Sequence, residues 1–308
     1  MDTPQPKPNS RASKSAYLKK RGGRRGVPTT LRLLRLGFQY LAPLMPGLAA
    51  RYAYRLWFST RRYAPPVREL RWEAEAERAS VATEHGDVAV YHWGDQGPTI
   101  LLIHGWNGRG TQLASFAQPL VDAGYQVVAF DGPGHGRSPG SWTSIFRLTD
   151  ATLAVVEKYG PVDGVIAHSF GSAVTAYALN HGLSTNRVVS ISAPASIHYL
   201  VERFCHAVRI PASLQRRLER RIEQRLNTDA EGDIWQYISP EANARQITGI
   251  PALIVHDSED HDVDVSHGER LHQAWQDSEL LTTSGLGHRR ILRNRQTIKQ
   301  IVDFITRA

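Results

Sequence analysis

The stretch at residues 162–179 constrains the fold of this chain more than any other. An apolar run at 162–167 ends abruptly at Ser169, and a helix-like segment follows at 172–179. A strand that turns this sharply into a helix strains the backbone of the serine and exposes its hydroxyl at the edge of a sheet. Small residues two positions before and after the serine, an alanine and a glycine, allow the strand and the helix to pack closely. The pattern therefore predicts a nucleophile at Ser169.

Further apolar runs of strand length alternate with helix-like segments along the rest of the chain. Strands are expected at residues 88–93, 99–104, 126–130, 162–168, 187–192, 252–255 and 280–283, and helices at 112–123, 145–159, 171–181, 268–276 and 295–306. This alternation predicts an α/β fold with a mostly parallel central sheet and helices on both faces. Ligands of such sheets bind at the carboxyl ends of the strands.

Short motifs follow four of these runs. They are His104-Gly105-Trp106, a D-x-x-G-x-G-x-S stretch at 131–138, an acidic loop at 257–264 and Gly287-His288. In this order and spacing, residues 80–308 resemble the α/β-hydrolase family, and more narrowly bacterial serine hydrolases with an N-terminal extension. The resemblance implies an α/β-hydrolase fold with a helical cap inserted at about residues 195–250.

The resemblance also implies the roles of individual residues. A serine hydroxyl needs a neighbouring base to act as a nucleophile at neutral pH. The family order of nucleophile, acid and histidine gives Ser169, Asp260 and His288 as the catalytic residues. The backbone N–H groups of Trp106 and Phe170 are expected to form the oxyanion hole.

Three more residues are expected to shape the pocket. His104 and Gly105 precede the first oxyanion donor, and His168 precedes the nucleophile. Gly105 is expected to let its loop turn so that the amides face the pocket, because it has no side chain.

The identity of the acid stays open between two residues. Carboxylates crowd the loop after the run at 252–255, at Asp257, Glu259, Asp260, Asp262 and Asp264. The family position falls on Asp260, and Asp257 is the alternative. The same loop contains histidines, but no zinc-type spacing such as H-E-x-x-H occurs in the chain. We therefore expect neither a catalytic metal nor a cofactor.

The positive charge of the chain belongs to its N-terminus. The net charge is +8, yet residues 1–36 alone contain ten Lys or Arg and one Asp, and residues 37–308 sum to −1. No nucleic-acid-binding motif accompanies these charges, so residues 1–30 are expected to be a basic disordered arm and no specific nucleic-acid partner is expected. The single cysteine, Cys205, excludes a disulfide framework.

An amphipathic, largely apolar segment follows the arm, and residues 31–65 are expected to form a helical extension. Three interpretations are open for this segment. It packs as a helix pair on the hydrolase body, it lies on an anionic membrane with the help of the arm through residues 1–60, or it is a secretory signal with Arg24-Arg25 as a twin-arginine element. Its uncharged part, at 36–50, is shorter than the roughly 20 residues of a membrane-spanning helix.

One helix of the expected cap has a clear pattern. Leu214, Leu218, Ile222 and Leu226 recur at every fourth position, and arginines occupy the opposite face. This spacing predicts a helix with an apolar underside. The arginines are interpreted as a solvated face, with attraction of an acidic substrate or lipid headgroup as the alternative.

The sequence as a whole predicts a serine hydrolase of esters or thioesters that acts on a small acyl substrate. Alternatives are a membrane-surface lipid acylhydrolase, an aminopeptidase-like hydrolase and a catalytically silent binding protein. An aminopeptidase would require carboxylates in the cap, such as Glu202, Asp229, Glu231 or Asp233, to bind a free amine. A cytoplasmic location is expected, with a peripheral position at the inner membrane as the alternative.

Overall fold

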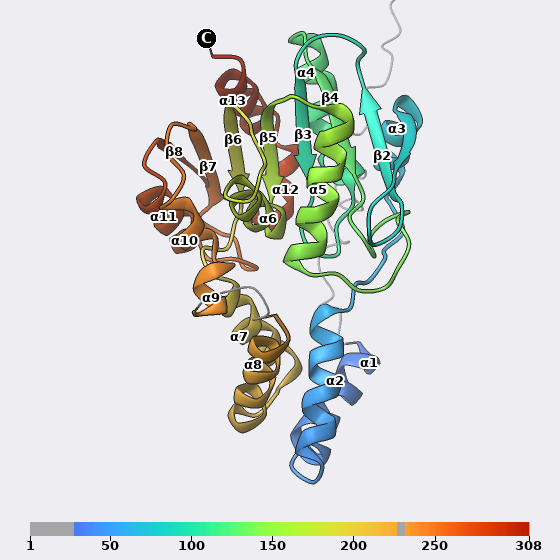
Figure 1. Ribbon diagram of the computed structural model, residues 1–308, viewed down its shortest axis with the longest axis vertical. Coiled ribbons are helices and arrows are strands. Elements are labelled where there is room, and N and C mark those ends of the chain that lie inside the picture. The colour runs from blue at the N-terminus through green and yellow to red at the C-terminus, as the bar shows by residue number, and fades with distance from the viewer. Residues whose placement is uncertain (1–27, 227–231, 308) are drawn as a thin grey trace, which may run out of the picture.

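A single eight-stranded sheet forms the centre of the molecule, in the order β1-β2-β4-β3-β5-β6-β7-β8 (Figure 1). The computed structural model describes residues 28–226 and 232–307. β2 pairs antiparallel with β1 and β4, and all other neighbouring strands pair in parallel. The mostly parallel sheet that the sequence predicts is therefore confirmed.

The apolar runs of the sequence correspond to seven of the strands. The strands are β1 (Glu77–Val81), β2 (Val88–Trp93), β3 (Thr99–Ile103), β4 (Gln126–Phe130), β5 (Val162–His168), β6 (Arg187–Ile191), β7 (Ala252–Asp257) and β8 (Ser278–Thr283). Parallel strands covered on both faces are apolar along their whole length, which makes them recognisable in sequence. β1 was not predicted, because this edge strand is polar and largely exposed. The sheet consequently begins before residue 80, where the domain was expected to start.

Helices cover both faces of the sheet. They are α4 (Ala117–Asp122), α5 (Ile145–Tyr159), α6 (Phe170–Leu179), α11 (Val265–Ala274), α12 (Gly287–Arg290) and α13 (Arg295–Ile305), with 3₁₀ turns η2 (Gly110–Phe116) and η3 (Ile291–Arg293). Along β3, Ile100 and Leu102 pack into the cluster that contains Phe304 of α13. Leu101 and Ile103 pack into the opposite cluster with α5. This alternation is the two-residue period of a strand buried on both sides.

The long connection between β6 and β7 is helical in its described part. It contains α7 (Ile197–Val208), α8 (Ala212–Leu226), α9 (Ile234–Tyr237) and α10 (Pro240–Ala244). Leu214, Leu218 and Ile222 are buried, as their spacing predicts. The arginines at 216, 217 and 220 on the same helix are exposed.

The N-terminal extension packs on these cap helices rather than on the sheet. It consists of α1 (Thr29–Leu36), the π-helix η1 (Gly37–Leu41) and α2 (Pro46–Phe58), and α3 (Val67–Glu75) follows it. Figure 1 shows α1 and α2 beside α7 and α8, below the sheet. Phe38, Ala50 and Ala53 share one buried apolar cluster with the underside of α8.

Two features expected near the N-terminus lie outside the described residues. These are nearly all of the basic arm at residues 1–30 and the pair Arg24-Arg25. Within residues 28–226 and 232–307, no helix has the length and apolar character needed to cross a bilayer.

Candidate active site

Ser169 occupies a strained turn between β5 and α6. Its backbone has φ 54° and ψ −120°, a conformation that residues with a side chain rarely adopt. The N–H of Ser169 donates a 2.8 Å hydrogen bond to the carbonyl of Ile191 on β6, which fastens the turn to the sheet. Gly171 is required here, because a Cβ at this position would lie 2.4 Å from the carbonyl oxygen of Ile103. The packing of strand against helix thus holds the turn in place.

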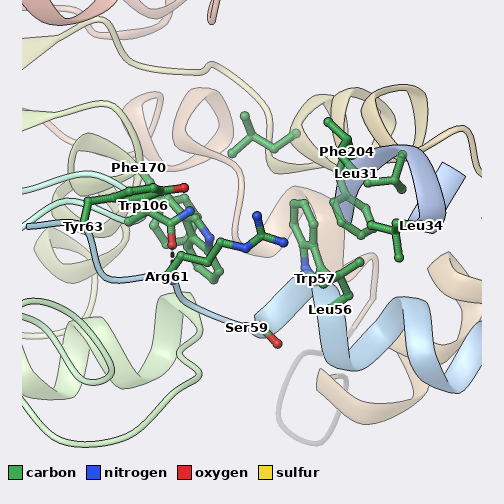
Figure 2. Close-up of a pocket in the computed structure, with 13 residues that line it drawn as sticks. Leu31, Leu34, Leu56, Trp57, Ser59, Arg61, Tyr63, Trp106, Phe170 and Phe204 are labelled. Carbon is green, nitrogen blue, oxygen red and sulfur yellow. Dashed lines mark hydrogen bonds between the residues drawn. The ribbon is translucent and has the colours of Figure 1, made fainter. Parts of the chain in front are cut away.

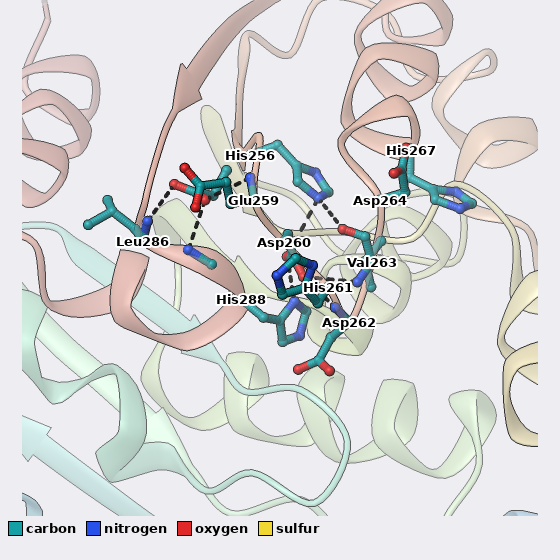
Figure 3. A network of polar contacts seen from close by, with 12 residues as sticks. His256, Glu259, Asp260, His261, Asp262, Val263, Asp264, His267, Leu286 and His288 are labelled. Carbon is teal, nitrogen blue, oxygen red and sulfur yellow. Dashed lines mark hydrogen bonds and ion pairs between the residues drawn. The ribbon is translucent and has the colours of Figure 1, made fainter. Parts of the chain in front are cut away.

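A histidine–carboxylate pair approaches the same strand ends. His288 Nδ1 lies 2.7 Å from Asp260 Oδ2 (Figure 3). The other carboxylate oxygen accepts the N–H groups of Asp262 and Val263, at 2.8 and 2.9 Å. An ionised carboxylate only accepts hydrogen bonds, so Nδ1 of His288 carries a proton and Nε2 is left as the basic nitrogen.

Asp260 is held in its charged form. Burial alone would raise its pKa, but the hydrogen bond and the charge of His288 lower it, as do the N–H groups of Val263 and Asp262. The net effect lowers the pKa of Asp260 to about 2. A permanently charged acid at this position orients the imidazole and stabilises its protonated form.

Asp257, the alternative acid, is engaged elsewhere. Its carboxylate accepts hydrogen bonds from the hydroxyl of Thr283 and from the N–H groups of Leu286, Gly287 and Glu259, at 2.7 to 3.0 Å. Leu286 and Gly287 belong to the segment that leads from β8 to His288, and Thr283 is the last residue of β8. Asp257 therefore fastens the loop that carries the histidine, and its hydrogen bonds lower its pKa against the effect of burial.

Ser169 and His288 line one small cavity together with the loop after β3. The cavity has a volume of about 130 Å³. Its wall consists of Tyr63, Gly105, Trp106, Asn107, Arg109, Gln112, His168, Ser169, His288 and Arg289. In the described part of the chain, no hydrogen bond joins the hydroxyl of Ser169 to His288, a gap that is common before a substrate binds. The sequence did not single out five of these residues, although three of them follow the His104-Gly105-Trp106 motif closely.

The need for glycine at position 105 arises from close contacts rather than from a left-handed backbone. Its φ is not positive, so no left-handed turn requires glycine here. A Cβ at Gly105 would instead lie 2.9 Å from the Cβ of Ser169 and 3.0 Å from the carbonyl oxygen of His168. Glycine is needed because the loop approaches the serine so closely.

The two expected oxyanion donors lie on either side of this close approach. Trp106 follows Gly105, and among the described residues its N–H has no backbone or side-chain acceptor. Phe170 is the first residue of α6, so its N–H has no acceptor within the helix. Both groups are therefore available to a negatively charged oxygen.

Two neutral histidines brace the loop after β3. His104 donates from Nδ1 to the carbonyl of Gly105 (2.7 Å) and accepts the N–H of Gly132 at Nε2 (2.9 Å). His135 accepts the N–H of Asn107 at 3.1 Å. Burial lowers the pKa of His104 to about 4. Burial, and after it the repulsion that a protonated His104 would exert, lowers the pKa of His135 to about 3. Both rings stay uncharged at neutral pH and keep these hydrogen bonds.

His168 supports the loop that carries His288. Its Nε2 donates to the carbonyl of His288 at 2.9 Å, and the two rings lie 4.7 Å apart. Burial and then the charge of His288 lower the pKa of His168 to about 3. A neutral His168 thus supports the backbone of His288 without competing for its proton.

The site contains no arrangement for a metal or for an amine-binding carboxylate in its described part. Within residues 28–226 and 232–307, no cluster of three or more His, Cys, Asp or Glu could hold a metal ion. Glu202 pairs with His198, Asp233 caps α9, and neither lines the cavity. Asp229 and Glu231 lie outside the described residues.

A sequence profile described as the alpha/beta hydrolase family matches residues 100–300. This chain belongs to that family. Among curated relatives of the hydrolase, a non-heme chloroperoxidase of Kitasatospora aureofaciens is 31% identical over 33% of this chain and 39% of its own length. A bifunctional esterase/perhydrolase of Acinetobacter calcoaceticus is 33% identical over 32% of this chain and 37% of its own length. The hydrolase therefore matches well under half the length of these relatives.

Solved structures extend the likeness in fold. An esterase from Exiguobacterium antarcticum matches 75% of this hydrolase and all of its own chain, with a TM-score of 0.57 and 18% identity. A membrane phospholipase A described as a bacterial virulence factor matches 91% of this hydrolase and 97% of its own chain, with a TM-score of 0.58 and 18% identity. At this level of identity the match is one of fold.

Proposed function

We propose that this hydrolase cleaves a carboxylic ester or thioester through an acyl-serine intermediate. One observation carries the proposal. The strained Ser169 and His288 line one cavity, and Asp260, from a third strand end, contacts His288 at 2.7 Å. A nucleophile, a base and a group that orients the base are the parts that acyl transfer by serine requires.

Proton transfer follows from the tautomer of His288. Nε2 takes the proton of the Ser169 hydroxyl as its oxygen attacks the carbonyl carbon, and Asp260 stabilises the resulting imidazolium. The same nitrogen then protonates the leaving alcohol or thiol as its bond to the acyl carbon breaks. A water molecule, deprotonated by His288, hydrolyses the acyl-serine in the second half of the reaction.

The N–H groups of Trp106 and Phe170 are proposed to stabilise the negative charge on the carbonyl oxygen. Each such donor lowers the barrier by roughly 3 kcal/mol in enzymes of this kind, because the charge forms only in the transition state. The network around His104 and His135 prevents the Trp106 amide from reorienting as the charge develops.

Esters and thioesters are favoured over amides and peptides for two reasons. Their leaving groups depart more readily than an amine, and among the described residues no carboxylate lines the catalytic cavity to bind a substrate amine. One of the matched relatives is named an esterase. A catalytically silent binding protein is the competing hypothesis.

Labelling with a fluorophosphonate, which reacts only with an activated serine, tests the proposal. We expect the wild-type chain to be labelled and Ser169→Ala and His288→Ala to lose the label. Ser213→Ala, at an exposed position on α8, is the matched control. Absence of label on a folded wild-type protein would reject the enzyme and favour the binding protein.

A further inference from the structure

A second, apolar cavity adjoins the catalytic one, and its wall comes largely from the N-terminal extension. It has a volume of about 360 Å³, within the range of small-molecule sites. Tyr63, Trp106 and Asn107 line both cavities, so the two meet at the loop after β3. Phe170, the neighbour of the nucleophile, also lines the apolar cavity.

Figure 2 shows Leu31, Leu34 and Phe204 together on one side of this cavity and Tyr63, Trp106 and Phe170 on the other, with the side chain of Arg61 between them. Leu31 and Leu34 of α1 and Leu56 and Trp57 of α2 form one group. Leu200, Phe204 and Val208 of α7 complete the apolar wall. The first group lies outside residues 100–300, which match the family.

Aromatic contacts join this wall to the loop after β3, which carries Trp106. The ring of Trp57 stacks on that of Trp106, with centroids 6.3 Å apart, and meets Phe204 edge-on at 5.4 Å. The N–H of Arg61 donates to the side-chain oxygen of Asn107 at 2.7 Å. The extension is therefore attached directly to the loop that carries a proposed oxyanion donor.

We propose that this cavity binds the acyl chain of the substrate and that the N-terminal extension sets the chain length accepted. The inference rests on the proposed function and deepens it, because it names the substrate class as esters of medium to long apolar acyl chains. A short acyl group would leave the cavity empty, whereas each added methylene buries apolar surface in it.

The test is a series of p-nitrophenyl esters from acetate to laurate. For the wild type, kcat/KM should rise by about fourfold per methylene until the cavity is filled, the factor that corresponds to about 0.8 kcal/mol per buried CH₂. Leu34→Trp should lower the ratio of kcat/KM for the octanoate and laurate to that for the acetate by about tenfold or more. Leu33→Trp, on the same helix but outside this cavity, should keep the wild-type profile.

The outcomes separate this inference from the proposed function. If hydrolysis depends on Ser169 but kcat/KM does not change with the length of the acyl chain, the acyl assignment alone is wrong. The same holds if kcat/KM depends only on the length of the alcohol in a series of acetate esters. Loss of Ser169-dependent hydrolysis for every ester would reject the proposed function. Leu200→Trp fills the same cavity from the cap side and serves if Leu34→Trp does not fold.

A second observation concerns the outer surface of the extension. Seven large apolar side chains are exposed by 50 to 77% on α1, η1, the following loop and α2. They are Leu33, Leu36, Tyr40, Leu44, Met45, Leu48 and Tyr52. We call them the tip patch, and Figure 1 shows the helices that carry it projecting from the body at the end opposite to the C-terminus. Leu33, Met45, Leu48 and Tyr52 line one hollow together, and exposed apolar surface of this kind marks an interaction site.

The charge around the tip patch identifies its partner. Seven Arg and no Asp or Glu lie between residues 28 and 68, in the part of the extension that the structure describes. Arg32, Arg51 and Arg55 are exposed on the same helices. An apolar surface that inserts and cations that attract anionic headgroups are together what stable binding to a membrane surface requires.

We infer that the tip patch docks this hydrolase on an anionic membrane surface. The test is flotation of the full chain with phosphatidylcholine vesicles that contain or lack phosphatidylglycerol. Binding should require phosphatidylglycerol and should fall by at least about tenfold when Leu44→Ser and Met45→Ser remove two inserted side chains. Arg51→Gln should weaken binding by about fivefold, the effect of one cation near an anionic surface.

The control removes two exposed apolar side chains from another place. Val67→Ser with Leu70→Ser, on α3, should leave flotation unchanged. Equal loss in both double variants, or no flotation of the wild type, would overturn the inference. If Leu44→Ser with Met45→Ser instead dissociates a dimer in sedimentation velocity, the patch binds a second copy of the chain and the membrane assignment is wrong.

Discussion

The strand ends of the central sheet and the N-terminal extension line adjoining cavities with opposite chemistry. At the strand ends the catalytic groups are polar, and the two carboxylates, Asp257 and Asp260, are held by several hydrogen bonds each. The extension contributes a mainly apolar wall that also contains Ser59 and Arg61, and this wall is held by packing and ring stacking. The comparison suggests that the sheet determines which reaction is catalysed and the extension determines which substrate reaches it.

The largest effects should come from the sheet. Ser169→Ala and His288→Ala should each lower kcat/KM for ester hydrolysis by at least about 10⁴-fold, because the nucleophile and its base act as one unit. The melting temperature should stay near that of the wild type. Ester hydrolysis and thermal unfolding measured on the same preparations check both statements, and residual activity above a tenth of wild type would contradict them.

The two neighbouring aspartates should separate catalysis from stability. Asp260→Asn should lower kcat by about 10³–10⁴-fold, because the amide no longer orients and supports the imidazolium. Asp257→Asn should instead lower the free energy of unfolding by about 1–3 kcal/mol, because N–H donors of the His288 loop lose a charged acceptor. Urea unfolding and steady-state kinetics of both variants distinguish these roles. The opposite pattern would make Asp257 the acid.

Trp57 joins the N-terminal extension to the loop after β3, and its removal tests this contact. Trp57→Ala should lower kcat by about tenfold for short and long esters alike, because the loop that carries Trp106 loses its stacking partner. Leu34→Trp, by contrast, should affect long esters more than short ones. An effect of Trp57→Ala on KM for long esters without any effect on kcat would show that the extension binds substrate but does not support the oxyanion loop.

The strained backbone of Ser169 predicts that a substitution there raises the free energy of unfolding, a smaller effect than those above. Ser169→Gly should raise the free energy of unfolding by about 1 kcal/mol, because glycine adopts φ 54° without steric cost. Ser169→Ala keeps the strain and is the control. A Ser169→Gly variant no more stable than Ser169→Ala would mean that the turn is not strained.

The smallest effect is a pH dependence of stability. The pKa of Asp260 is about 2 in the folded chain, against about 3.9 in an unfolded one. Its contribution to stability is complete above about pH 4 and is lost as the pH falls towards 2. Urea midpoints between pH 5 and pH 3 should therefore fall less for Asp260→Asn than for the wild type. Parallel curves would contradict the lowered pKa.

The sheet was predictable because buried parallel strands and the motifs at their ends are local signals. The bounds of α5 and the positions of seven strands follow from apolar runs and from polar residues that end them. Edge strand β1 has neither signal. The strained turn at Ser169 was also expected, since small flanking residues and a strand–helix junction are visible in sequence.

The sequence alone leaves open which aspartate contacts His288 and how the extension packs. Asp257 and Asp260 are three residues apart, and only the path of the loop decides which carboxylate reaches His288. The amphipathic pattern of residues 31–55 suits a protein surface and a membrane surface equally well. In the structure one side of it packs on the cap and the other is exposed, which a linear pattern does not reveal.

The accessibility of the single cysteine reports on the contact between the extension and the cap helices. Cys205 is 1% exposed within the cluster that joins the extension to α7 and α8. Burial, together with the charges of Glu219 and Glu202, raises the pKa of its thiol to about 12, so the closed form is inert to alkylation. The rate of thiol modification therefore measures how often the extension separates from the cap helices. Binding of vesicles or of a long-chain ester would change that rate, and no engineered label is needed to observe it.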